Sequence, residues 1–235
     1  MDEVGTAVVI RDSIAPWRPL LRLGTVSAIV VVVMIPIQAA VFILSPPPTT
    51  VGDFFALFQR NPLLGLLDLD LLLTFDCLVM IPFYLTLFVL LRHVARSAAL
   101  LALTLGLFSL VLFLFSRDAT FSMWMVSDQY AVAGSEAQKA ALMATGQTLP
   151  TLYNGGRFGL SYVLGAVSTL VFSGAMFKHP LFGRRPGTIG VFTGITMLIP
   201  PNSGRLGLTV AILSLAPTAV WRVVLARTFR RCARA

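Results

Sequence analysis

The feature that most constrains this chain is a run of apolar residues without a single charge, from Leu23 to Leu44. A helix needs about 20 mostly apolar residues to cross the ~30 Å hydrocarbon layer of a lipid bilayer. The apolar part of a cleaved signal peptide has only about 7–15 residues, so this run is too long to be one. We therefore expect it to form a transmembrane helix.

Further apolar stretches follow along the chain, at 71–91, 98–115, 158–177 and 206–226, with a shorter one at 186–200. Over the whole chain 57% of the residues are hydrophobic and 12% are charged, whereas an ordinary soluble domain carries roughly 25% charged residues. Such a chain cannot cover its own surface with polar groups, which excludes a water-soluble monomer and a disordered chain. The sequence predicts an all-α polytopic membrane protein, a single integral membrane domain over residues 1–235 with six transmembrane helices.

The placement of charges indicates whether the short stretch 186–200 crosses the membrane. Lys and Arg in short loops prefer the cytoplasmic side. With six crossings, most of the 18 Lys and Arg residues lie on one side together with both termini. Without this crossing the arginine-rich tail faces outward and the bias is lost, so we predict six crossings and cytoplasmic N- and C-termini. Gly190 and Gly194 permit close helix approach, which we assign to packing inside the monomer rather than to a dimer.

The net charge of +8 is explained by the same arrangement. The protein's main partner is the lipid bilayer, and the cytoplasmic Lys and Arg residues are expected to attract anionic lipid headgroups, at about 1 kcal/mol per nearby basic residue. A nucleic-acid footprint would also need interleaved aromatic residues or a recognised fold, so no nucleic acid is expected as a partner. Arg222 lies near the inner end of the last stretch, where its long side chain is expected to snorkel to the interface.

The longest segment outside the apolar stretches runs from Ser116 to Gly156. Its sequence from Ser135 to Gln138 matches the pattern of a capping box, in which Ser or Thr is followed three residues later by Glu or Gln. It predicts a helix through Ala144, with Gly146 as the C-terminal stop. A shorter helix around 128–133 is expected before it. Together these elements predict a small helical lid on the outer face, between spans three and four.

Several stretches carry a resemblance to a known family: 61–72, 127–131 with the alanine-rich helix after it, and the two prolines 200–201 before the last span. They resemble an uncharacterised family of bacterial multi-spanning inner-membrane proteins, a domain of unknown function. The resemblance covers most of the chain after the first span. It implies a multi-pass protein of the bacterial cytoplasmic membrane with no agreed activity, and it supplies no catalytic residues.

An acid inside an apolar stretch marks the candidate site. An ionisable group in hydrocarbon costs about 2.5–3.5 kcal/mol, so Asp76 is expected to face a partner or a water-filled cavity. At 100° per residue, Asn154, Arg157 and Ser161 share one face where the fourth span enters from the outer side. An Asp76–Arg157 pair would offset the desolvation of both groups. With Arg205 near the start of the last span, these residues predict an outward-open polar pocket beneath the lid, the alternative being a pair that only fixes packing.

The chemistry that the chain offers points away from catalysis. His93 and His179 stand apart from any cluster of His, Cys or Glu, so neither a metal nor another cofactor is expected. Ser161 and Ser168 have no His or Lys at the same depth to activate them. We therefore expect a non-enzymatic membrane module, a sensor or accessory subunit, that binds something small or an unknown protein partner at the outer pocket. A small permease is the alternative, and an intramembrane enzyme is the third.

Overall fold

The structure, a computed structural model, describes residues 14–45, 48, 50–66 and 71–234. Throughout this part of the chain the regular elements are helices, so the predicted all-α class is confirmed. Parts of the predicted domain (1–13) and of the stretch 61–72 (67–70) lie outside the described residues. The elements are η1 (Ala15–Trp17), α2 (Arg18–Leu44), α3 (Val51–Arg60), α4 (Pro62–Leu66), α5 (Leu72–Ala131), α6 (Glu136–Tyr153), α7 (Gly156–Met176), α8 (Arg184–Thr196) and α9 (Gly204–Arg234).

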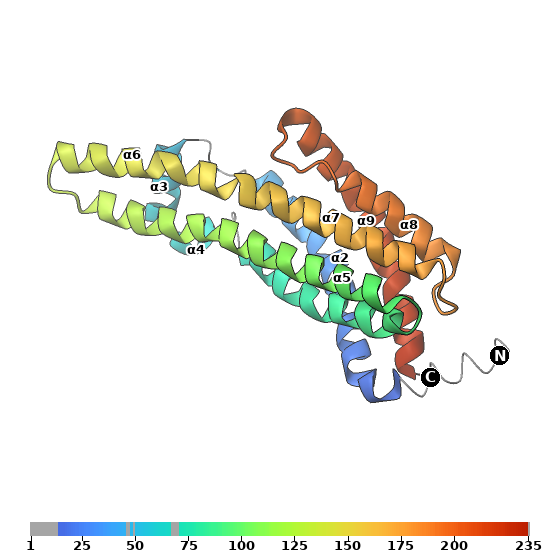
Figure 1. The fold of residues 1–235 in the computed structure, drawn as a ribbon. Coiled ribbons are helices and arrows are strands. Elements are labelled where there is room, and N and C mark those ends of the chain that lie inside the picture. The colour runs from blue at the N-terminus through green and yellow to red at the C-terminus, as the bar shows by residue number, and fades with distance from the viewer. Residues whose placement is uncertain (1–13, 46–47, 49, 67–70, 235) are drawn as a thin grey trace.

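The long helices form a bundle in which α6 and α7 follow one another in the same direction, antiparallel to the part of α5 that precedes them (Figure 1). Although α5 is counted as one helix, Ala95 has φ −143° and ψ 58°, and the chain turns back on itself there. The beginning of α2 and the end of α9 lie together, since Arg22 and Arg230 line the same groove. The turn at Ala95 lies nearby, because the Arg92 guanidinium is 5.0 Å from the centre of the Trp17 ring. We call this end of the bundle the terminal end.

Within the described residues, four helical stretches are long and apolar enough to cross a membrane: Ala15–Val41, Leu72–Ala131, Glu136–Met176 and Gly204–Arg234. The stretches expected at 71–91 and 98–115 lie on either side of the turn at Ala95. The stretch expected at 186–200 falls on α8, whose 13 residues span about 20 Å at ~1.5 Å per residue. That is shorter than the ~30 Å hydrocarbon core, so the sixth crossing stays a prediction.

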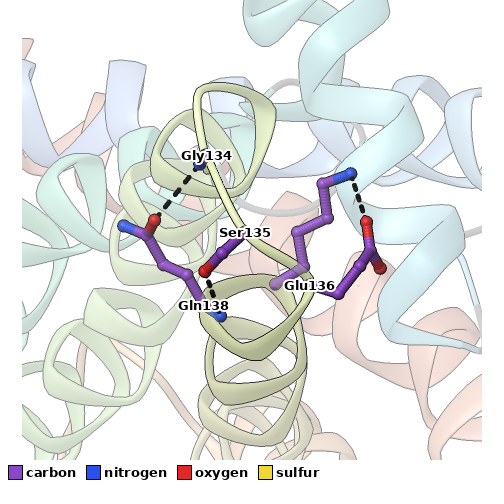
Figure 2. A network of polar contacts seen from close by, with 5 residues as sticks. Gly134, Ser135, Glu136 and Gln138 are labelled. Atoms are coloured by element: carbon purple, nitrogen blue, oxygen red, sulfur yellow. Dashed lines mark hydrogen bonds and ion pairs between the residues drawn. The ribbon is translucent and has the colours of Figure 1, made fainter.

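The part of α5 after Ala95 is about 54 Å long at ~1.5 Å per residue, much longer than the hydrocarbon core is thick. Its last turns and the antiparallel α6 therefore form a hairpin that projects beyond the bundle (Figure 1). The predicted capping box begins α6, as Figure 2 shows. The Gln138 backbone N–H donates to Ser135 Oγ at 3.2 Å, and the Gly134 N–H donates to Gln138 Oε1 at 3.2 Å.

The helix bounds expected for the small lid differ from those of this hairpin. Residues 128–131 are the last turn of α5 rather than a separate helix, and α6 continues past Gly146 to Tyr153. Gly146 does not stop the helix; it allows α3 to approach closely. A Cβ at Gly146 would lie 2.6 Å from Val51 Cγ1 and 2.9 Å from Phe55 Cζ. The sequence could not show this contact, because glycine at a helix end and glycine at a close approach look alike.

Two hydrophobic clusters hold the described chain together. The larger one fills the bundle between α2, α5, α7 and α9. The smaller one joins α3 to the hairpin base and consists of Val51, Phe55, Phe58, Met123 and Leu149. In α8, a Cβ at Gly190 would lie 2.5 Å from Trp221 Nε1, and one at Gly194 would lie 2.6 Å from Leu170 Cγ. The glycine pair therefore serves packing inside the monomer, as expected.

Candidate functional site

A half-open cavity of about 210 Å³ lies among α2, α5, α7 and α9. Most of its wall is apolar. A small number of polar side chains face it: Gln38, Asp76, Tyr84, Ser109, Ser161, Tyr162, Thr218 and Arg222. Apolar walls with a few convergent polar groups are the usual form of a small-molecule site.

Arg222 is the charged group that the wall of α9 contributes, and its side chain is only 9% exposed. Nη1 donates to Met80 Sδ at 2.7 Å, and the guanidinium carbon lies 4.7 Å from the centre of the Phe83 ring. Nε has no hydrogen-bond partner among the described residues. A guanidinium has five N–H donors, so these contacts leave much of its donor capacity unused.

Asp76 contributes the opposite charge from the wall of α5. Its Oδ1 is buried and, in the described part of the chain, finds no hydrogen-bond donor. Met80 follows it by four residues on the same helix face, a spacing of about 5–6 Å between Cβ atoms. Since the Arg222 guanidinium contacts Met80, both charged groups lie on the same cavity. Neither is neutralised by direct contact with the other.

The unpartnered polar atoms of the described chain concentrate at this cavity. Four buried side-chain nitrogen or oxygen atoms lack a partner within the described residues, and three of them, on Gln38, Asp76 and Arg222, belong to side chains that line the cavity. The fourth is Nε2 of His179. Buried polar groups are normally hydrogen-bonded. Their concentration here indicates that the cavity holds water or a ligand.

The structure brings together two of the residues expected from the sequence. Asp76 and Ser161 line the same cavity. The Ser161 hydroxyl donates to the Phe158 carbonyl at 2.7 Å, and the Ser161 carbonyl accepts a hydrogen bond from Ser109 Oγ at 2.7 Å. The backbone of Ser161 therefore holds α7 against α5 at the cavity wall, while Asp76 Oδ1 has no hydrogen-bond donor among the described residues.

The other expected residues lie elsewhere. Asn154, Arg157 and Arg205 are exposed and are not among the residues that line the cavity. The Asn154 carbonyl accepts a hydrogen bond from Asn202 Nδ2 at 2.7 Å, which ties the start of α7 to the turn before α9. The charge that faces Asp76 across the cavity is Arg222, not Arg157.

Sequence reasoning missed Arg222 because it placed this residue at the end of a span. In the structure α9 continues to Arg234, about three turns further, so Arg222 is interior and does not snorkel. Its neighbour Trp221 is fixed by a hydrogen bond from Nε1 to the Pro186 carbonyl at 3.0 Å. The available signal was an arginine inside the apolar stretch 206–226, next to a tryptophan.

A second buried arginine lies outside the cavity, at the base of the hairpin. Arg117 is 3% exposed. Nη2 donates to the Tyr153 carbonyl at 2.8 Å and Nε donates to Ser116 Oγ at 3.0 Å. The guanidinium carbon lies 3.6 Å from the centre of the Tyr153 ring and within 5.0 Å of the Phe113 and Phe158 ring centres. This arginine clamps α5 to α6 and α7.

Long apolar helices around a small cavity with a few polar side chains define a helical integral membrane protein. The family model described as a domain of unknown function, DUF4386, matches residues 23–227, and the chain belongs to this family. The resemblance seen in the sequence is thereby confirmed. No curated protein and no solved structure matches the chain.

Proposed function

We propose that this membrane protein is a non-enzymatic binding module, a sensor or accessory subunit, whose cavity holds a small zwitterionic molecule. The observation that carries the proposal is the pair Asp76 and Arg222. Both face one cavity, and in the described chain the Asp76 carboxylate and the Arg222 guanidinium each retain a buried atom without a partner. A ligand with an ammonium group and an acidic group at opposite ends would satisfy both through charge-assisted hydrogen bonds.

The size and chemistry of the cavity support a small ligand. A protein cavity of about 150 Å³ can hold benzene, and this one is about 210 Å³. A molecule of amino-acid size fits that volume. An unpaired charge in an apolar site is costly, so a ligand that carries one charge would leave the opposite side chain of the pair unsatisfied.

The proposed orientation places both termini in the cytoplasm of a bacterial cell, with six crossings of the inner membrane. Basic side chains gather at the terminal end: Arg18, Arg22, Arg92, Arg96, Lys178, Arg184, Arg185, Arg227, Arg230, Arg231 and Arg234. The described acids, at positions 53, 76, 118, 128 and 136, all lie away from this end. The preference of Lys and Arg for the cytoplasmic side supports this orientation, and the hairpin then lies outside the cytoplasm.

The binding proposal is tested on purified protein in lipid nanodiscs. We expect glycine, β-alanine or phosphoethanolamine to raise the melting temperature, whereas acetate and ethylamine, which carry one charge each, do not. Asp76→Asn and Arg222→Gln each abolish the effect. The matched controls Asp128→Asn and Arg60→Gln, at exposed positions away from the cavity, preserve it. Equal stabilisation of all five proteins, or none in the wild type, contradicts the proposal.

A small permease is the second candidate, because transporters bind substrate between helices near the middle of the bilayer and this cavity lies between helices of the bundle. The two functions differ in turnover. Uptake of the stabilising zwitterion into proteoliposomes, lost in Asp76→Asn, supports the permease. Binding without uptake supports the module. An intramembrane enzyme is the third candidate; it would need a base to activate a hydroxyl, and among the described lining residues the carboxylate of Asp76 is the group that could serve as one.

A further inference from the structure

A second hollow lies at the terminal end, between the first turns of α2 and the last turns of α9. It is an open groove of about 340 Å³ and shares no residue with the cavity. Its lining residues are Arg22, Thr25, Val26, Ile29, Arg230, Ala233 and Arg234. The proposed binding function does not use this groove.

The groove gathers three guanidinium groups, and none of the described acidic residues lines it. Arg22, Arg230 and Arg234 are exposed, and within the described residues none of them has an ion pair or hydrogen bond. Arg230 and Arg234 are four residues apart on one helix, a spacing at which like charges destabilise the helix. An anion between the three groups removes this repulsion. The oxygens of a phosphate group match the planar fork of arginine.

Below the arginines the wall of the groove becomes apolar. Val26 and Ile29 line it and are 57% and 51% exposed, and Val33 continues the same face with 52% exposed. These residues follow Arg22 at four, seven and eleven residues, the spacing of a single helix face. From Arg22 to Val33 the strip is about 16 Å long at ~1.5 Å per residue. A charged head with an apolar strip beneath it fits an amphiphile lying along α2.

The groove also lies at the depth expected for lipid headgroups. Trp17, which is 38% exposed, lies just before α2 and precedes Arg22 by five residues. The Arg92 guanidinium lies 5.0 Å from the centre of its ring. Tryptophan at this level is typical of the membrane–water interface, with Lys and Arg on the cytoplasmic side.

We propose that the groove between α2 and α9 is a binding site for one anionic phospholipid. The phosphate lies among Arg22, Arg230 and Arg234, and an acyl chain lies on the strip formed by Val26, Ile29 and Val33. A free phosphate ion would use the arginines and leave the apolar strip uncovered. The lipid therefore joins the first and last helices of the bundle from outside.

The test is retention of lipid by the full-length protein, measured by native mass spectrometry after extraction from nanodiscs of phosphatidylcholine mixed with phosphatidylglycerol. We expect the wild type to keep one phosphatidylglycerol in preference to phosphatidylcholine. The double variant Arg22→Gln/Arg230→Gln should bind it about 30-fold more weakly, because each arginine contributes about 1 kcal/mol. If the wild type retains the two lipids equally, this measurement alone overturns the proposal.

The matched control is Arg184→Gln/Arg185→Gln, which removes the same charge from the terminal end but outside the groove. We expect it to keep the lipid within about twofold of the wild type. Equal weakening of both double variants would mean diffuse attraction and overturn the site. Circular dichroism in neutral detergent establishes that each variant is folded. If the double variant is not folded, Arg230→Lys, which keeps the charge and loses the planar fork, replaces it in the retention experiment.

Two further arms separate the lipid from free phosphate. Inorganic phosphate added to the wild type should fail to displace phosphatidylglycerol, and displacement would show a phosphate site instead. Ile29→Thr changes only the apolar strip and should weaken retention of phosphatidylglycerol severalfold. Unchanged retention in this variant would remove the acyl chain from the proposal and overturn it. Neither arm touches Asp76 or Arg222, so the outcome is independent of the cavity.

Discussion

Two buried arginines in two regions of the molecule have opposite surroundings. At the hairpin base, Arg117 donates to two oxygens and lies among three aromatic rings. In the bundle, Arg222 contacts one sulfur and one ring, and its Nε has no partner among the described residues. A buried charge with its contacts made stabilises a fold, whereas one with contacts left unmade reduces stability and is a candidate for binding.

Other polar groups in the bundle resemble those of the hairpin base rather than those of the cavity. Ser168 Oγ donates to the Ala102 carbonyl at 2.6 Å, and Thr86 Oγ1 donates to the Leu20 carbonyl at 3.1 Å. Such hydroxyl-to-carbonyl bonds between helices are ordinary in membrane proteins. They show that this bundle can satisfy its buried polar groups, which makes the unsatisfied charges at the cavity more informative.

The largest expected loss of stability comes from comparing substitutions at two glycines, one in each region. Gly190→Val places side-chain atoms against Trp221, whose ring is fixed by its hydrogen bond to Pro186. Because the ring cannot move aside, we expect α8 to leave the bundle at a cost above about 3 kcal/mol. The yield of monodisperse protein after size-exclusion chromatography should collapse.

Gly146→Val is the matched change in the hairpin. It meets the ends of the Val51 and Phe55 side chains, which can shift, so we expect a cost of about 1–3 kcal/mol confined to α3 and the hairpin. Limited proteolysis should cut near α3 while the bundle stays intact. If Gly190→Val purifies as well as Gly146→Val, the packing of α8 described here is wrong.

The second effect concerns the arginine at the hairpin base. Arg117→Leu removes the ring contacts and leaves the Tyr153 carbonyl without the donor at 2.8 Å. Desolvated cation–π contacts and charged hydrogen bonds together predict a loss of about 3 kcal/mol. Thermal unfolding in detergent measures it. A change within error would remove the contrast between the two arginines.

The sequence predicted helices well because the length and apolarity of a run largely determine whether it is helical in a membrane protein. The cap of α6 at Ser135 was equally readable, since capping is local. Which helix faces pack against each other could not be predicted from the sequence. The partner of Asp76 depends on how α5 and α9 rotate against each other, and that rotation is set by contacts such as Phe83 with Trp221, whose ring centres lie 5.8 Å apart.

A smaller effect tests a buried histidine that lies outside both regions. His179 is in the loop between α7 and α8, and burial lowers its pKa to about 4. Above pH 6.5 the side chain is neutral in both states. As the pH falls from about 6.5 to about 4, the unfolded chain takes up a proton that the folded chain does not, so stability is lost in this window. One pKa unit corresponds to about 1.4 kcal/mol.

His179→Gln removes this contribution, so we expect its melting temperature to fall less between pH 7 and pH 5 than that of the wild type, by a few degrees. The control is His93→Gln, at an exposed position near the same loop, which should keep most of the dependence. Identical pH profiles for the wild type and His179→Gln would contradict a buried neutral imidazole.

The smallest expected change in stability is at the cavity, and it tests the contrast between Arg222 and Arg117 directly. The double variant Asp76→Leu/Arg222→Met replaces both incompletely satisfied buried charges by apolar side chains of similar size, a kind of change that is often neutral or stabilising. We expect thermal unfolding in detergent to shift by less than about 1 kcal/mol, in contrast to Arg117→Leu, while stabilisation by zwitterions disappears. A loss as large as that of Arg117→Leu would mean that Asp76 and Arg222 also hold the fold together, and the argument from their unmade contacts would fail.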